Sequence, residues 1–161
     1  MLRMWLFWVV VLAPLAGLAA PPQGYAFVNL TEAIQRASES GKPMLLYFGR
    51  YGCSTCRKMH AEVFSDPTLG KRLNEDFVLA YVDTESGERI RLPNGERTTE
   101  MQFAARSRII GTPTFVFYAD SQTPLFQKAG FQSIEQMRDY ADYVAGGHYR
   151  LQDLKAYRAA R

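Results

Sequence analysis

The sequence predicts one α/β domain in which a central mixed sheet of about four to five strands is flanked by helices on both faces. Short apolar runs bounded by glycine or proline alternate with segments of helical periodicity, and this alternation is typical of such layered folds. The chain has 161 residues, enough for one domain with a substantial core. Its hydrophobic fraction of 47% suits a packed globular protein.

The first strand–helix–strand unit spans residues 25–49. Tyr25–Val28 has the character of a short strand, and Thr31 is expected to cap a helix that Gly41 ends. The apolar run Pro43–Gly49 lies between residues that break secondary structure, so we predict a buried strand there.

Two more helices and a strand are expected next. The segment containing both cysteines begins a helix that runs to about Phe64. Asp66-Pro67 interrupts that helix and starts another, because proline is favoured at a first helical position. The apolar run Phe77–Thr84 then predicts a strand.

Residues 85–98 are polar and contain Asn94-Gly95, a favoured hairpin turn, so we expect a small hairpin or a mobile loop. Thr99 and Gln102 have the spacing of a capping box and predict a short helix to about Arg108.

The C-terminal part begins with two neighbouring strands, residues 112–120 and 124–131, which a short turn should pair in antiparallel fashion. Ser133 and Gln136 form a second capping box and predict a helix that Gly146-Gly147 ends. In the remaining tail, residues 148–161, we expect a loose terminal helix.

The N-terminal residues 1–19 have the pattern of a secretory signal peptide, with one early arginine, an apolar run and small residues at its end. Gly17 and Ala19 occupy the small positions if cleavage follows Ala19. An uncleaved membrane anchor is the alternative, although the run carries Pro14 and is shorter than the roughly 20 residues of a membrane span. Either interpretation places the domain of residues 20–161 outside the cytoplasm.

The charged residues form no basic block. The 19 lysines and arginines are interspersed with 16 aspartates and glutamates, and the formal net charge is +3. A nucleic-acid interface needs a concentrated positive patch, so we expect no nucleic-acid partner.

Cys53 and Cys56 are the 2 cysteines of the chain, and such a pair can serve four functions. Haem attachment needs histidine directly after the second cysteine, where this chain has Arg57. A structural disulfide is geometrically possible, but so small a loop contributes roughly 2 kcal/mol, against about 3 kcal/mol for a fifteen-residue loop.

A metal site would have few ligands. Zinc usually takes four, and the soft ligands of the chain are Cys53, Cys56, His60 and His148. A thiolate pair for Cu(I) is conceivable. We expect both histidines to be surface or partly packed side chains and predict no metal site.

A redox function fits the position of the pair best. Cys53 follows a predicted strand and begins a helix, where free N–H groups and the helix dipole stabilise a thiolate. Arg50, Arg57 and Lys58 add positive charge nearby. Cys56 should lie deeper, be more shielded and keep its proton. We therefore predict that Cys53 is the nucleophile and Cys56 the resolving cysteine of a redox-active disulfide.

With these motifs the chain resembles the thioredoxin-fold family from about residue 25 to residue 147. The Cys-x-x-Cys segment is one anchor, and Gly111-Thr112-Pro113-Thr114 followed by a strand is the other. The resemblance implies a cis peptide bond before Pro113, contact of that proline with the cysteines, and substrate-peptide binding by the backbone of Thr112.

The chain also departs from the best-known members of that family. Gly52 stands where those members have tryptophan, and Ser54-Thr55 where they have Gly-Pro. Tyr47 occupies the position of a buried acid that aids proton transfer to the second cysteine. The overall pattern is similar to exported bacterial thioredoxins of sulfur-oxidation systems (SoxW-like) and of cytochrome c maturation.

The resemblance implies a thiol:disulfide reductase that needs no cofactor. Its partners would be exported protein thiols and disulfides and a membrane electron donor. No segment is long enough for the helical insertion of periplasmic oxidases, and the extra domain through which isomerases dimerise is not found, which favours the reducing direction. The resemblance also implies a location in the bacterial periplasm, and we expect a monomer. Two alternatives remain: a copper-binding protein that uses the same cysteines, and a binding module that keeps only the fold.

Overall fold

The computed structural model describes residues 20–160 as a five-stranded mixed sheet with helices on both faces, which confirms the predicted fold class. The strand order is β1-β3-β2-β6-β7. β1, β3 and β2 run parallel, whereas β6 is antiparallel to β2 and β7 is antiparallel to β6. The strands of this sheet are β1 Phe27–Val28, β2 Met44–Gly49, β3 Val78–Asp83, β6 Thr114–Tyr118 and β7 Pro124–Ala129.

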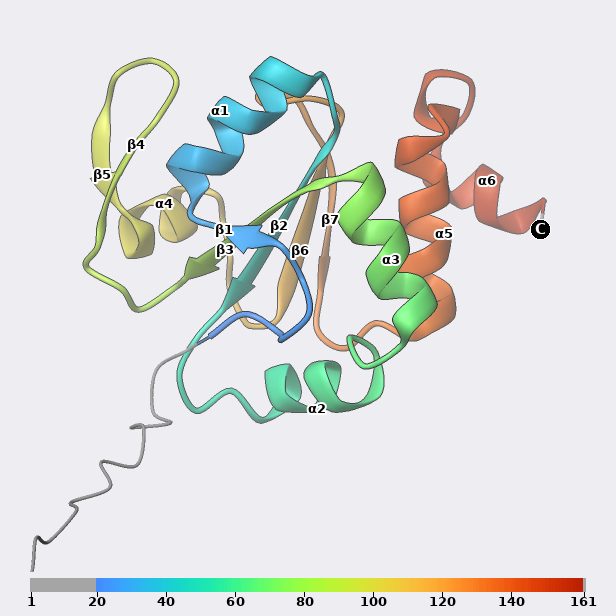
Figure 1. The fold of residues 1–161 in the computed structure, drawn as a ribbon, viewed down its shortest axis with the longest axis horizontal. Helices are drawn as coiled ribbons and strands as arrows, with labels where there is room; N and C mark the ends of the chain where they lie inside the picture. The colour runs from blue at the N-terminus through green and yellow to red at the C-terminus, as the bar shows by residue number, and fades with distance from the viewer. Residues whose placement is uncertain (1–19, 161) are drawn as a thin grey trace, which may run out of the picture.

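Figure 1 shows how the helices cover the sheet: α1 and α4 lie on one side with the β4–β5 hairpin, and α3 and α5 lie on the other. α2 crosses the end of the sheet at which β2 stops. The helices are α1 Leu30–Ser40, α2 Ser54–Glu62, α3 Pro67–Asp76, α4 Glu100–Arg106, α5 Ile134–Ala145, the 3-10 turn η1 His148–Arg150 and α6 Leu154–Ala159. The predicted hairpin consists of β4 Arg89–Arg91 and β5 Arg97–Thr99.

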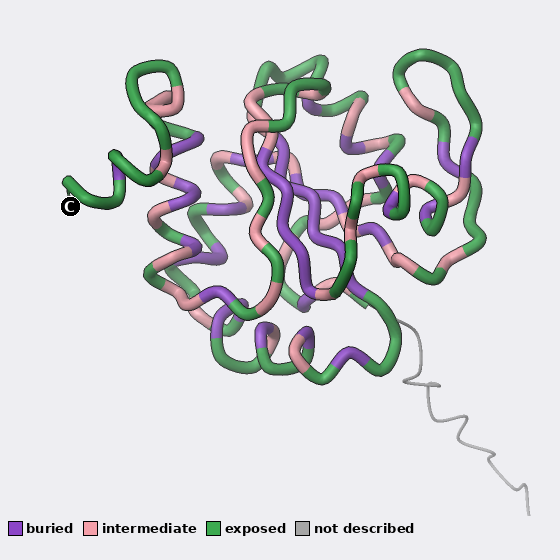
Figure 2. The backbone as a smooth tube through the Cα atoms, turned by 180° about the vertical axis from the view of Figure 1, so that it is seen from behind, coloured by how far each residue is buried: buried purple, intermediate pink, exposed green. Residues whose placement is uncertain are grey.

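β2 divides the core into two, because successive side chains of a strand point to opposite faces. Leu45 and Tyr47 pack on the face covered by α2, α3 and α5. Met44, Leu46 and Phe48 pack on the face covered by α1 and α4. All six residues of the strand are buried, and the buried backbone of this sheet runs through the middle of the molecule in Figure 2.

The predicted cap of the first helix was wrong by two positions. Asn29 is the N-cap, and its side-chain oxygen accepts a hydrogen bond of 2.9 Å from the N–H of Glu32. The hydroxyl of Thr31 instead accepts from the N–H of Arg91 at 3.1 Å and donates to the carbonyl of the same residue at 3.3 Å. Thr31 therefore holds α1 against the hairpin, a long-range contact that local sequence does not reveal.

The remaining boundaries agree closely with prediction. Both capping boxes are present, at Thr99 with Gln102 and at Ser133 with Gln136. The tail differs from the loose helix that we predicted, because Tyr157 of α6 is buried against the core. None of the helices found between residues 20 and 160 could span a lipid bilayer. The predicted signal peptide, residues 1–19, lies outside the described residues.

Candidate functional site

The cysteine pair lies at the start of α2, where β2 turns into that helix. Gly52 adopts the left-handed conformation (φ 70°) that makes this turn possible. Cys53 is the N-cap of α2, and its Sγ accepts a hydrogen bond from the N–H of Cys56 at 3.0 Å. The two cysteines form a disulfide with a Cα–Cα distance of 5.2 Å. The first sulfur thus lies at the positive end of a nine-residue helix.

The two cysteines are equally buried, contrary to the expected shielding of Cys56. Cys53 and Cys56 are each 6% exposed. Both sulfurs are held in one disulfide. The two cysteines differ in their neighbours. Cys53 contacts the loop before β6, whereas Cys56 lies within α2, one turn before His60.

The structure brings the predicted second motif to the cysteines. Sγ of Cys53 lies 3.4 Å from the carbonyl oxygen of Thr112, 59 residues away in sequence. The peptide bond between Thr112 and Pro113 is cis. The loop is fixed by Gly130, whose N–H donates to the carbonyl of Pro113 at 2.7 Å. All four predicted site residues therefore meet at one place.

A cavity of about 850 Å³ lies beside the disulfide. Its walls come from α2, from the ends of β2 and β3, and from the N-terminal segment 20–23. The polar and charged side chains that line it include Tyr47, Tyr81, His60, Arg50 and Arg57. The cavity gives the disulfide an open side on the face of the sheet that carries α2.

Tyr47 and His60 form a hydrogen-bonded pair in this cavity. The hydroxyl of Tyr47 and Nε2 of His60 are 3.0 Å apart, and the rings meet edge to face with centroids at 5.8 Å. Burial raises the pKa of Tyr47 well above its usual range, and burial lowers the pKa of His60. From the sequence we expected His60 to be a surface or partly packed side chain. Its position four residues after Cys56 does predict that His60 and Cys56 share one face of the helix.

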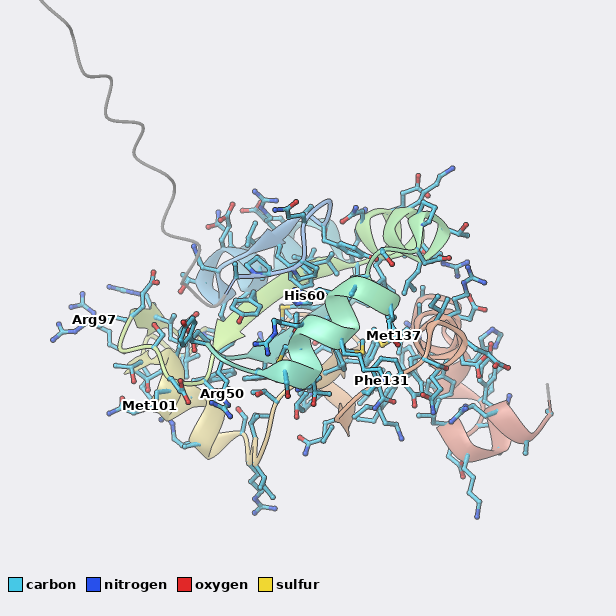
Figure 3. All side chains as sticks on the ribbon, turned by 90° about the horizontal axis from the view of Figure 1, so that it is seen from below. Arg50, His60, Arg97, Met101, Phe131 and Met137 are labelled. Carbon is cyan, nitrogen blue, oxygen red and sulfur yellow. A yellow bond between two sulfur atoms is a disulfide. The ribbon has the colours of Figure 1, made fainter. Side chains whose placement is uncertain are left out.

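Two cations, Arg50 and Arg57, line the cavity beside the disulfide, and Lys58 follows them on α2. Arg50 pairs with Glu85 at 3.2 Å, and Lys58 lies over the ring of Phe131 at 4.7 Å from its centroid. In Figure 3, Arg50 and Phe131 lie on opposite sides of α2. Lys58 also pairs with Glu62 at 4.0 Å, so Arg57 is the cation of the cavity wall for which no ion pair is described between residues 20 and 160.

His148 lies away from the site, stacked on the ring of Tyr157 with centroids 4.8 Å apart. Within residues 20–160, no three side chains of the histidine, cysteine, aspartate or glutamate type are grouped as metal ligands would be. His148 therefore does not join Cys53, Cys56 and His60 in a common ligand set.

The fold and the Cys-x-x-Cys pair together indicate a thiol–disulfide oxidoreductase of the thioredoxin-fold class. Residues 30–145 match the thioredoxin-like domain family. Because this match covers most of the chain, the protein belongs to that family.

Solved structures of this class superpose on most of the chain. A thioredoxin-fold protein from Helicobacter pylori gives a TM-score of 0.64 at 23% identity, covering 84% of this chain and 94% of that one. A thioredoxin from Thermus thermophilus gives 0.60 at 25% identity, covering 81% and 98%. A DsbH oxidoreductase gives 0.54 at 17% identity, covering 83% and 92%.

Curated relatives match over a short segment only. Spermatogenesis-associated protein 20 from Mus musculus is 37% identical over 54 residues, which is 34% of this chain and 7% of that protein. The human protein of the same name is 39% identical over 54 residues, which is again 34% of this chain and 7% of that protein. The chain thus corresponds to a small part of these relatives.

Proposed function

We propose that this protein is a periplasmic thiol:disulfide reductase whose Cys53–Cys56 dithiol reduces disulfides of exported proteins. Cys53 attacks the substrate disulfide and forms a mixed disulfide, and Cys56 then displaces the reduced substrate. Two electrons pass from the cysteine pair to the substrate. A membrane-bound dithiol donor returns the pair to the reduced state.

The observation that carries this proposal is the contact of the Cys53 sulfur with the Thr112 carbonyl. It supports a site where an extended substrate lies along the backbone of residues 111–113 with its disulfide next to Cys53. The small disulfide loop supports reversible chemistry over stapling, because so short a loop stabilises the fold little.

The reducing direction is supported by the simple architecture of the described residues. Between β3 and β6 the chain contains only the β4–β5 hairpin and α4. The resemblance to thioredoxins that act in sulfur oxidation or cytochrome c maturation suggests where the substrates belong. The exported location is supported by the signal-peptide pattern of residues 1–19.

Trapping tests the function and the roles of the two cysteines. Cys56→Ser leaves Cys53 able to attack but removes the resolving thiol, so partners should accumulate as mixed disulfides. The variant, with its N-terminal segment intact, would be expressed in a bacterial host and its adducts separated on non-reducing gels. We expect adducts that disappear on reduction.

The matched control is the double variant Cys53→Ser/Cys56→Ser, which should trap nothing. A Cys53→Ser variant that traps partners while Cys56→Ser does not would reverse the assigned roles. Absence of adducts in every variant would contradict the enzymatic function, and tight Cu(I) binding by the same preparation would then favour the copper-binding alternative.

A further inference from the structure

Cys56 and His60 lie one turn apart on α2, and both line the cavity beside the disulfide. Side chains at positions i and i+4 of a helix are neighbours on the same face. In Figure 3, His60 lies on the side of α2 opposite to Phe131. The imidazole and the second sulfur thus belong to one face of α2 and line one cavity.

The position of the imidazole is fixed by two aromatic rings. Tyr47, which is 0% exposed, hydrogen-bonds Nε2, and the ring of Phe64 meets the imidazole edge to face at 6.0 Å. A phenol hydroxyl can donate a hydrogen bond or accept one. Tyr47 can therefore hold the ring of His60 both when Nε2 is an acceptor and when it carries a proton.

The second step of disulfide exchange needs a base at this place. The thiolate is the attacking form of a cysteine, and a thiol buried like Cys56 resists losing its proton. At neutral pH His60 is uncharged, because burial lowers its pKa from 6.5, and a neutral imidazole can accept a proton.

Two phenols and two guanidinium groups that face the cavity do not compete for this proton. Burial raises the pKa of Tyr47 and of Tyr81, and the carboxylates of Asp83 and Glu100 raise that of Tyr81 further. Both phenols therefore stay protonated. The arginines at the rim, residues 50 and 57, are cations and cannot accept a proton.

We propose that His60 accepts the proton of the Cys56 thiol during resolution, with Tyr47 as the positioning residue. This inference rests on the proposed exchange function. The Cys56 sulfur forms a bond to Cys53 and breaks the bond between Cys53 and the substrate sulfur. The substrate leaves as a thiolate with the electron pair of that bond. The proton of Cys56 passes to Nδ1 of the imidazole, which accepts it while Nε2–H donates to Tyr47, and from there to solvent.

The step can be timed on the reduced protein with a nitrobenzoate disulfide as the probe. Cys53 releases one coloured thiolate when it attacks, and Cys56 releases a second when it resolves. In the wild type we expect the rate of the second release to fall only in acid, at a pH below the 6.5 of a free histidine, because burial lowers the pKa of His60. In His60→Gln we expect it to be about 100-fold slower at pH 7. In His60→Gln the rate should instead keep rising with pH, because the Cys56 thiolate then forms without a neighbouring base.

Two variants separate proton transfer from a structural effect. In His60→Ala, added imidazole should restore the second release, since the cavity is large enough to admit it. Tyr47→Phe removes only the hydroxyl that hydrogen-bonds His60. It should slow the second release less than His60→Gln does, and it should shift the pH at which the rate of that release falls. His148→Gln changes the other histidine, which stacks on Tyr157, and should leave the profile unchanged.

If the rate of the second release depends on pH in His60→Gln as it does in the wild type, the inference is overturned while the exchange function stays intact. Failure of imidazole to rescue His60→Ala would have the same meaning. If His60→Gln does not fold, the Tyr47→Phe profile decides, and an unshifted one overturns the inference. A wild type that releases only one thiolate at every pH would overturn both, because Cys56 would then not resolve.

Discussion

Gly49 and Tyr81 meet at the end of β2, one residue before the loop that leads to the cysteines. A Cβ added at Gly49 would lie 2.5 Å from the hydroxyl of Tyr81 and 2.8 Å from its ring. The absence of a side chain at this position therefore lets the Tyr81 ring lie over the strand and form part of the cavity wall. Glycine is needed here because the Tyr81 side chain occupies the space of a Cβ. The backbone conformation itself is one that any residue can adopt.

Gly49→Ala should consequently displace Tyr81 and destabilise the protein by about 1–3 kcal/mol, the usual cost of overpacking. Chemical denaturation measures this change. Gly87→Ala is the matched control, because nothing lies within 4 Å of a Cβ at that position. Equal stability of the two variants would show that Tyr81 moves aside without cost.

The helices begin where a side chain satisfies free N–H groups. The N-caps are Asn29, Asp66, Thr99, Ser133 and Asp153, and Cys53 takes the same place in α2 with its sulfur. In α2, the cap and the reacting atom are the same.

Ser133→Ala should lower the free energy of unfolding by about 1 kcal/mol, because it removes the cap of α5 and half of a capping box. Equilibrium denaturation measures it. Ser38→Ala on the exposed surface of α1 is the control and should be neutral or slightly stabilising, since alanine is the better helix former. A loss at Ser38 as large as that at Ser133 would argue against the cap as the cause.

These element boundaries were largely predictable because caps and breakers are local signals. Asn29 was missed because Thr31, a residue type that also caps helices, lies two positions later and makes a tertiary contact instead. Cys53, Cys56, Thr112 and Pro113 were predictable from motifs. The pairing of Tyr47 with His60 was not, because it depends on how α2 crosses the end of β2.

Two cores, one on each face of the sheet, hold the molecule together, and β2 contributes side chains to both. The disulfide lies at the end of this structure and closes a loop between residues three apart in sequence. The fold should therefore be nearly independent of the oxidation state of the cysteines, as a protein that cycles between two redox forms requires.

Reduction should lower the free energy of unfolding by only roughly 2 kcal/mol, the loop-entropy contribution of so short a loop. Denaturation of the oxidised and reduced forms, followed by far-ultraviolet circular dichroism, measures the difference. The Cys53→Ser/Cys56→Ser variant should not respond to the reductant. Unfolding of the wild type on reduction alone would instead identify the disulfide as a structural staple.

The midpoint potential of the Cys53–Cys56 couple tests the proposed function most directly. The protein would be equilibrated with defined ratios of reduced and oxidised dithiol, and the free thiols counted by alkylation. A reductase should give a reversible two-electron transition nearer the potential of thioredoxin, about −270 mV, than that of the strong periplasmic oxidant, about −120 mV. A midpoint near −120 mV would contradict the reducing direction, and a pair that does not titrate reversibly would contradict the redox function itself.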